Sequence, residues 1–110
     1  MSSRRSLEGI YAARGDSESE EFREAYEETR RTYEFGVLTR ALRKAAGLTQ
    51  QELAARMSTT ASAIARLEAG GTSPTFATLE HLATALGVRL RLEVADADAN
   101  DLPSVTFGAA

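Results

Sequence analysis

Apolar residues recur at steps of three and four along most of the chain, which is the spacing of amphipathic helices. The first long stripe has steps of four, seven and four between its members, which are Phe22, Tyr26, Tyr33 and Val37. A capping-box pattern opens this segment at Ser17, and a shorter apolar repeat covers residues 6–14 before it. We therefore expect a short helix followed by a longer one that begins at Ser17.

A group of shorter helices is predicted between residues 34 and 88. A second apolar stripe, ended by Gly47, consists of Leu38, Ala41, Leu42 and Ala45. Threonines at capping positions then open three more helices, namely Thr49, Thr60 and Thr75. The residues expected to face inward from these helices are Leu53, Ala54, Ile64, Leu67, Phe76, Leu79, Leu82, Ala83 and Leu86. Glycines at 70–71 and at Gly87 end the last two helices.

The pattern changes to strict alternation after Gly87. Residues 88–94 alternate apolar and polar side chains without error, which predicts a half-buried strand, and residues 105–107 form a second short candidate. A two-stranded hairpin is only marginally stable by itself, so we expect a further sheet edge from a second copy of the chain. The dimer contacts expected from the first strand are Val88, Leu90, Leu92 and Val94.

The composition of the chain excludes most kinds of catalytic site. The chain has no cysteine and a single histidine, so disulfides, thiolate metal sites and histidine clusters are excluded, and we expect no metal or cofactor. No carboxylate is paired with a base in a catalytic pattern, so an enzyme is not expected. No apolar run reaches the ~18 residues of a membrane span, and no secretory signal is visible. We expect a cytoplasmic protein.

The charge is unevenly distributed along the chain. The total is −3, but residues 36–94 carry seven basic and four acidic side chains, whereas residues 1–35 carry six basic and nine acidic ones. Three further aspartates follow after residue 94. A basic centre between two acidic arms fits a DNA-facing domain whose arms contact something else.

Residues 48–70 carry the functional motif. Two capped helices of about eight residues, joined by a short turn, form a helix-turn-helix. The first helix of such a unit lies across the DNA backbone with its free amides towards a phosphate, and the second enters the major groove. Small side chains at Ala54, Ala61 and Ala63 allow the two helices to approach closely.

Three groups of residues in this motif resemble the Xre/Cro/C1-type repressors, which are lambda-repressor-like. They are Leu48-Thr49-Gln50, Glu52-Leu53-Ala54 and the Ile64, Arg66, Glu68 series. The resemblance implies that Gln50 holds a phosphate, and that Arg43 and Glu68 form a structural salt bridge between the first and third helices of the domain. The DNA contacts that it implies are Thr49, Gln50, Gln51, Thr60, Ala61, Ser62, Arg66 and Thr72.

Two features depart from that family pattern. The turn carries Ser58 where a glycine is usual, and a left-handed conformation there would cost roughly 1 kcal/mol. Arg66 is the one residue of the recognition helix suited to a bidentate contact with guanine, so a single half-site is expected to bind weakly. Dimerisation is then required for useful specificity.

The predicted fold is mainly α: a four- to five-helix lambda-repressor-like helix-turn-helix domain with an N-terminal helical extension and a short C-terminal β element. We assign residues 1–33 to an acidic helical extension, residues 34–88 to the DNA-binding domain, and residues 89–110 to a strand and tail for dimerisation. The expected function is a repressor that binds a palindromic operator as a homodimer.

The flanks resemble those of HigA-type antitoxins, on residues 6–14 and 21–27 and on the strand after Gly87. That resemblance implies a small basic toxin of the RelE/HigB type as a partner, with Phe22, Tyr26 and Tyr33 as its contacts. The acidic stretch is also what a solvated helix face would show, and its aromatic residues also fit packing on the domain's own helices. A stand-alone regulator without a toxin, and a protein-interaction module that does not bind DNA, remain alternatives.

Overall fold

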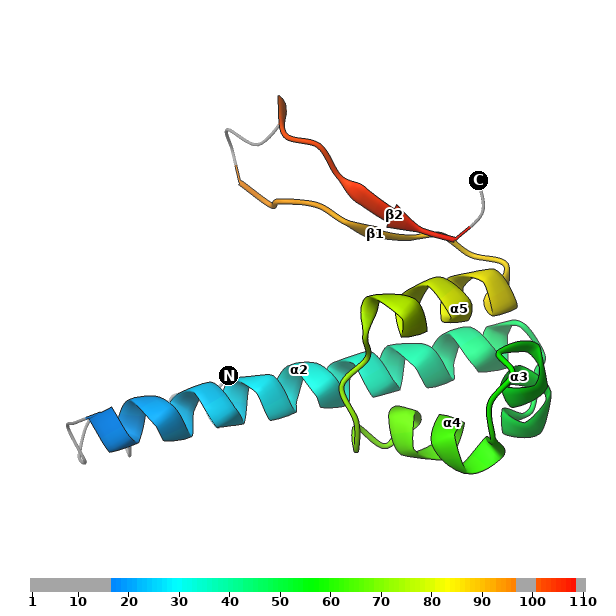
Figure 1. The fold of residues 1–110 in the computed structure, drawn as a ribbon, viewed down its shortest axis with the longest axis horizontal. Helices are drawn as coiled ribbons and strands as arrows, with labels where there is room; N and C mark the ends of the chain where they lie inside the picture. Colours follow the sequence, from blue (N-terminus) through cyan, green and yellow to red (C-terminus); the bar gives the residue numbers. More distant parts are fainter. Residues whose placement is uncertain (1–16, 97–100, 109–110) are drawn as a thin grey trace.

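A computed structural model describes residues 17–96 and 101–108 of the chain, with side chains described from Ser19 onward. In these ranges the elements are α2 (Ser17–Ala45), α3 (Gln50–Arg56), α4 (Ala61–Glu68), α5 (Phe76–Leu86), β1 (Leu90–Leu92) and β2 (Val105–Phe107). The three short helices gather along the C-terminal half of α2, and the two strands stand off beyond α5 (Figure 1). The predicted mainly α fold is confirmed. The short helix expected over residues 6–14 lies outside the described residues.

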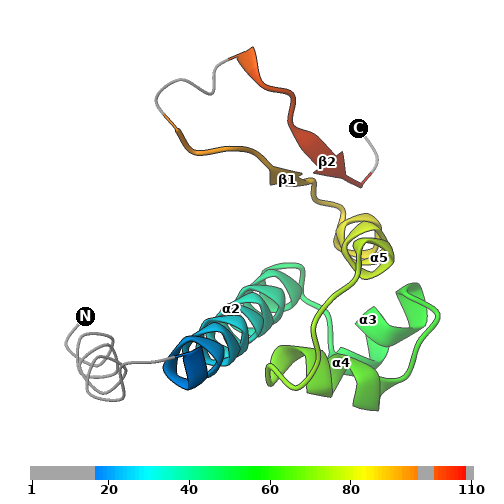
Figure 2. The same ribbon diagram turned by 60° about the vertical axis from the view of Figure 1, so that its left-hand side comes forward.

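Helix α2 is a single 29-residue helix that passes without a break through the expected boundary between extension and domain. Side-chain pairs one turn apart support the stretch around that boundary: Arg30 contacts Glu27 at 3.1 Å and Glu34 at 2.8 Å. The N-terminal half of α2 projects beyond the other helices (Figures 1 and 2). The extension is therefore continuous with the first helix of the DNA-binding domain.

The predicted inward stripe of α2 is wrong in part. Leu38 is 46% exposed, and Ala41 and Ala45 are exposed as well. The face that is buried carries instead Gly36, Thr39 and Arg43, with Phe35 and Leu42 half-buried beside them. An apolar pattern could not reveal this face, because two of its buried members are polar residues that satisfy their hydrogen bonds inside the protein.

Gly36 explains how closely α2 and α4 approach. A Cβ atom at this position would lie 2.5 Å from the carbonyl oxygen of Glu68, so only glycine fits the crossing. Three residues further on, the Thr39 hydroxyl donates to the carbonyl of Phe35 at 2.9 Å, which allows a fully buried threonine. The contact between α2 and α4 is therefore made largely by backbone and polar groups.

The apolar core joins the three short helices. Its buried members are Leu53, Ala54, Ile64, Leu82, Ala85 and Leu86, with Phe35, Leu42, Leu48, Met57 and Val88 packed against them. All three predicted capping threonines are confirmed, since Thr49, Thr60 and Thr75 each accept a hydrogen bond from the backbone N–H three residues later. The sequence thus predicted the core of α3 and α4 and the start of each short helix.

Phe76 was expected to face inward and does not. It begins α5 at the edge of the core, where it is 73% exposed and contacts the ring of Phe107 with centroids 5.7 Å apart. The buried face of α5 starts one turn later and consists of Leu82, Ala83, Ala85 and Leu86. Periodicity placed Phe76 on the correct stripe, but the helix extends past the core at that end.

The first strand of the C-terminal hairpin is shorter than expected, whereas the second strand, over residues 105–107, lies where it was predicted. The strand predicted over residues 88–94 is reduced to three residues, and its partner is β2 of the same chain in antiparallel register. Phe107, opposite Leu90, is 8% exposed against α5, and the Gly108 N–H donates to a Glu80 carboxylate oxygen at 3.1 Å. Contacts with α5 therefore stabilise a hairpin that would be marginal by itself.

Candidate nucleic-acid interface

Helices α3 and α4 form a helix-turn-helix through residues 57–60. Ser58 has φ 55, so a non-glycine residue occupies the left-handed conformation that this turn requires. The Thr59 N–H then returns to the carbonyl of Ala54 at 2.9 Å, which closes the end of α3. The family pattern places glycine at this point for that reason, and this chain tolerates the strain of serine instead.

Thr49 holds the N-terminus of α3 through a complete capping box. Its hydroxyl accepts the Glu52 N–H at 3.0 Å, and the Glu52 carboxylate accepts the Thr49 N–H at 2.8 Å. The hydrogen bond from the Thr49 N–H to the carboxylate lowers the pKa of Glu52 below its ordinary value. The hydroxyl of Thr49 is thus engaged within the fold, while Gln51 beside it is exposed.

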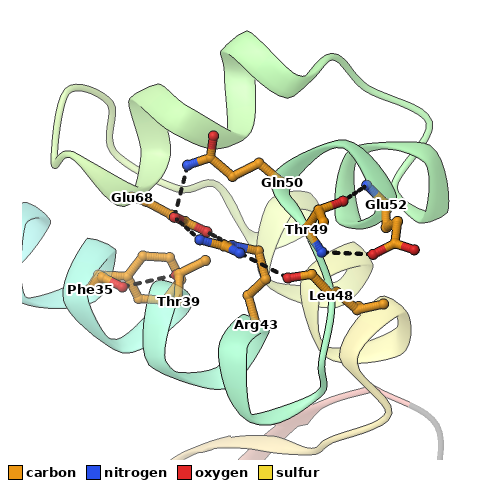
Figure 3. Close-up of polar contacts among 8 residues, drawn as sticks. All are labelled: Phe35, Thr39, Arg43, Leu48, Thr49, Gln50, Glu52 and Glu68. Atoms are coloured by element: carbon orange, nitrogen blue, oxygen red, sulfur yellow. Dashed lines mark hydrogen bonds and ion pairs between the residues drawn. The ribbon is translucent and has the colours of Figure 1, made fainter.

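A buried ion pair joins α2 to the end of α4 (Figure 3). Arg43 Nε and Nη2 donate to the two Glu68 carboxylate oxygens at 2.6 and 3.0 Å, and the side chains are 10% and 4% exposed. Arg43 Nη1 also donates to the carbonyl of Leu48 at 2.8 Å. These are the two residues that the resemblance pairs, and the geometry is bidentate.

Gln50 belongs to the same cluster. Its Nε2 donates to Glu68 Oε1 at 3.1 Å, so the first residue of α3 is bonded to the last residue of α4 (Figure 3). The resemblance implies only a phosphate contact for Gln50, and this bond was not predicted. Its partners are 18 residues apart in the sequence, so no local pattern indicates it.

Electrostatics keep this cluster charged at neutral pH. Burial raises the pKa of Glu68, but hydrogen bonds from Arg43 and Gln50 and the positive charges of Arg43 and Arg40 outweigh it, so the pKa lies below the ordinary value. The hydrogen bond to Glu68 likewise raises the pKa of Arg43. The pair is therefore an ionised carboxylate against a guanidinium.

The outer face of α4 presents the expected reading residues. Thr60 caps the helix through the Ala63 N–H at 3.1 Å, Ser62 and Arg66 are exposed, and Ala61 is half-buried. Arg66 makes no ion pair or hydrogen bond with any residue of the described ranges, so its guanidinium is available to a ligand. These residues share one short helix, as the resemblance implies.

The loop after α4 carries Thr72, which is exposed. The same loop passes close to the Arg66 side chain and the Tyr33 backbone, since a Cβ atom on Gly71 would lie 2.9 Å from Arg66 Cγ and one on Gly70 would lie 2.9 Å from Tyr33 Cα. Thr72 therefore lies next to the recognition helix on one side and to α2 on the other.

Helix α2 exposes part of its aromatic stripe. Phe22 is 49% exposed and Tyr33 is 58% exposed, while Tyr26 between them is half-buried. Among the described residues, no three His, Cys, Asp or Glu side chains gather as a metal site would require. No helix in the same ranges has the length and apolar character needed to cross a membrane.

Comparisons with known proteins agree with this geometry. Residues 40–92 match the family model described as HTH_3: Helix-turn-helix. The chain is also similar to the crystal structure of the restriction-modification controller protein C.AhdI from Aeromonas hydrophila, with 32% identity and a TM-score of 0.53. That match covers 55% of this chain and 87% of the other. No curated protein sequence matches the chain.

Proposed function

Since the chain belongs to the HTH_3 helix-turn-helix family and is a DNA-binding transcriptional regulator, we propose that it is a repressor of its own operon. The observation that carries this proposal is the exposed face of α4, where Ser62 and Arg66, which has no ion pair within the described residues, project from a helix fixed to α2 and α3. A helix held in this way enters a major groove as a rigid unit.

The contacts divide into two groups. Ser62 and Arg66 read base edges, with Thr60 and Ala61 at the start of the same helix, and a bidentate contact from Arg66 to guanine is worth about 1–3 kcal/mol of discrimination. Backbone-positioning contacts come from residues around the two helix starts and the following loop, namely Thr49, Gln50, Gln51 and Thr72.

We propose that the repressor acts as a homodimer on a palindromic operator, with recognition helices about 34 Å apart. An exposed apolar surface around the hairpin supports this arrangement, and it consists of Phe76, Leu92, Val94, Leu102 and Val105. Of the four dimer contacts expected from the sequence, Leu92 and Val94 lie on this surface. Val88 packs on the core instead, and Leu90 is half-buried opposite Phe107.

The more specific proposal is an antitoxin that also binds a small basic toxin of the RelE/HigB type. Its support is α2, where glutamates and the exposed ring of Phe22 lie on the projecting half, and the exposed ring of Tyr33 lies beside the loop after α4. Acidic charge speeds the encounter with a basic partner, and aromatic side chains provide the anchors of such interfaces. A stand-alone regulator is the second candidate, and the similarity to a restriction-modification controller protein favours it.

A gel-shift titration on the DNA upstream of the chain's own gene tests the proposal. Wild type should bind, and Arg66→Ala should lose preference for this DNA over a scrambled duplex. Arg31→Ala is the matched control, because it removes the same charge from an exposed position on the extension. If wild type does not bind this DNA even at low salt, the repressor proposal is wrong.

Adding the product of the neighbouring gene separates the two candidates. An antitoxin should form a complex with that product, and Phe22→Ala with Tyr33→Ala should weaken it while DNA binding is retained. A stand-alone regulator should show the same DNA shift with and without the added protein.

A further inference from the structure

Gln50 is the one residue of the proposed DNA interface whose side chain is hydrogen-bonded to another helix. Its Nε2 lies 3.1 Å from Glu68 Oε1, across the junction between the start of α3 and the end of α4. Gln51, its neighbour in sequence, is exposed and free of any such contact within the described part of the chain. The chain therefore offers one fixed and one free glutamine at the same helix end.

Glu68 determines which way the Gln50 amide points. An ionised carboxylate only accepts hydrogen bonds, so it must face the NH2 group of Gln50 and not its carbonyl oxygen. The NH2 group carries two hydrogens, and one of them is used by Glu68. The second remains as a donor at the surface, and a DNA phosphate supplies the matching acceptor.

The carboxylate is itself held in place. Arg43 donates to both of its oxygens, at 2.6 and 3.0 Å, and a further nitrogen of Arg43 is bonded to the carbonyl of Leu48 just before α3. Figure 3 shows the three side chains converging from three helices. Any movement of Glu68 would therefore break contacts with α2 and α3 together.

We propose that Glu68 is a positioning residue for DNA binding, which orients the Gln50 amide so that its second N–H meets a phosphate at a fixed distance from the recognition helix. This inference rests on the proposed function. The ion pair with Arg43 gives Glu68 a role in stability, and the proposal adds a role in DNA affinity. A side chain fixed before binding loses less freedom when the phosphate arrives, so the contact is stronger than one from a mobile glutamine.

A double-mutant cycle in operator binding tests this role, using Gln50→Ala, Glu68→Met and the double variant on the upstream DNA. Glu68→Met keeps the length of the side chain but removes both acceptor oxygens, so nothing orients the Gln50 amide. Gln50→Ala should weaken binding about tenfold in the wild-type background, and about twofold or less beside Glu68→Met. Gln51→Ala is the control, because no contact within the described residues orients the Gln51 side chain.

If the two substitutions act independently, the double variant loses operator affinity by the product of the two single effects. That result would overturn the proposal and show that Glu68 contributes to stability only. So would a Gln50→Ala variant that binds like wild type. Either result leaves repressor function intact, whereas absence of binding by the wild type itself would remove the proposed function.

A second measurement uses the wild-type protein, so it does not depend on whether a variant folds. In the NMR spectrum of the wild-type protein, the side-chain amide hydrogens of Gln50 should exchange with water more slowly than those of Gln51, because Glu68 holds them. Equal exchange of the two amides would show that Gln50 is not held and would contradict the proposal.

Discussion

A single carboxylate connects three helices of this domain, because Glu68 at the end of α4 accepts hydrogen bonds from Arg43 on α2 and Gln50 on α3. Its side chain is 4% exposed, so loss of either charge would leave the other buried and unpaired. Breaking a buried pair by removing one partner costs about 3–5 kcal/mol. The stability of the domain should depend on this residue more than on any exposed ion pair.

The low pKa of Glu68 predicts an acid-sensitive fold. Because the folded pKa lies below the ordinary value of 4.5, the stabilisation is complete above about pH 4.5 and is lost as the pH falls through the folded pKa. Urea denaturation between pH 7 and pH 3 should show wild type losing stability below pH 4.5, and Glu68→Gln should be less stable at pH 7 with a flatter profile. Glu93→Gln is the control, since that side chain is 65% exposed. Parallel profiles for Glu68→Gln and wild type would contradict this assignment.

Ser58 carries strain that glycine would relieve. Its φ of 55 costs an L-residue about 1–2 kcal/mol, and the added freedom of glycine in the unfolded chain offsets about half of the gain. Ser58→Gly should therefore raise the free energy of unfolding by about 0.5–1 kcal/mol, measured by urea denaturation. Ser73→Gly, at an exposed serine without positive φ, should be neutral or destabilising. If both variants lose stability equally, Ser58 is not strained.

At the scale of elements, the crossing of α2 and α4 decides where the recognition helix lies. Gly36 allows it, because its missing Cβ would lie 2.5 Å from a backbone oxygen of Glu68 that no side-chain rotation can move. The two helices would have to separate to admit even an alanine. Such a shift would also displace the Arg43–Glu68 pair, which lies about two turns further along α2.

Gly36→Ala should therefore destabilise the fold although alanine favours helices. Overpacking costs about 1–3 kcal/mol, which exceeds the gain of about 1 kcal/mol in helix propensity, so we expect a net loss of up to about 2 kcal/mol in thermal denaturation. Ala41→Gly, at an exposed position of the same helix, measures the effect of helix propensity alone and should lower the free energy of unfolding by about 1 kcal/mol. A Gly36→Ala protein more stable than wild type would show that the helices do not cross this closely.

The sequence predicted the elements that local patterns specify and missed those that depend on distant contacts. Capping threonines and apolar periodicity placed α3, α4 and α5 and the inward residues Leu53, Ile64 and Leu82. The same periodicity misassigned α2, since its buried face relies on Thr39 and Gly36, whose fit is evident only once the neighbouring helix is present. The bond from Gln50 to Glu68 was missed for the same reason, because 18 residues separate its partners.

At the scale of the molecule, one end of the hairpin packs against α5 and the other end is exposed. Its apolar face begins with Leu90 and Phe107 against the body of the protein and continues with Leu92 and Val105, which are 60% and 51% exposed. Figures 1 and 2 show this end of the hairpin standing away from the helices. A surface that changes from buried to exposed along one sheet face fits a partner that completes it. The palindromic operator proposed above would require that partner to be a second copy of the chain.

The two faces of β2 provide a matched test of that dimer. Val105 lies on the apolar face, whereas Thr106, a side chain of nearly the same shape, lies on the opposite one and pairs with Arg91. Val105→Lys should shift the protein towards a monomer in analytical ultracentrifugation and lower operator affinity at least about tenfold, because each half-site binds weakly alone. Thr106→Lys adds the same charge and should leave both unchanged. The thermal transition should move little for Val105→Lys, since the position is exposed. It should fall slightly for Thr106→Lys, because two like charges then face each other across the strands. If Val105→Lys remains a dimer, the hairpin does not pair the two recognition helices, and Phe76, the member of the apolar surface that lies on α5, is the next position to substitute.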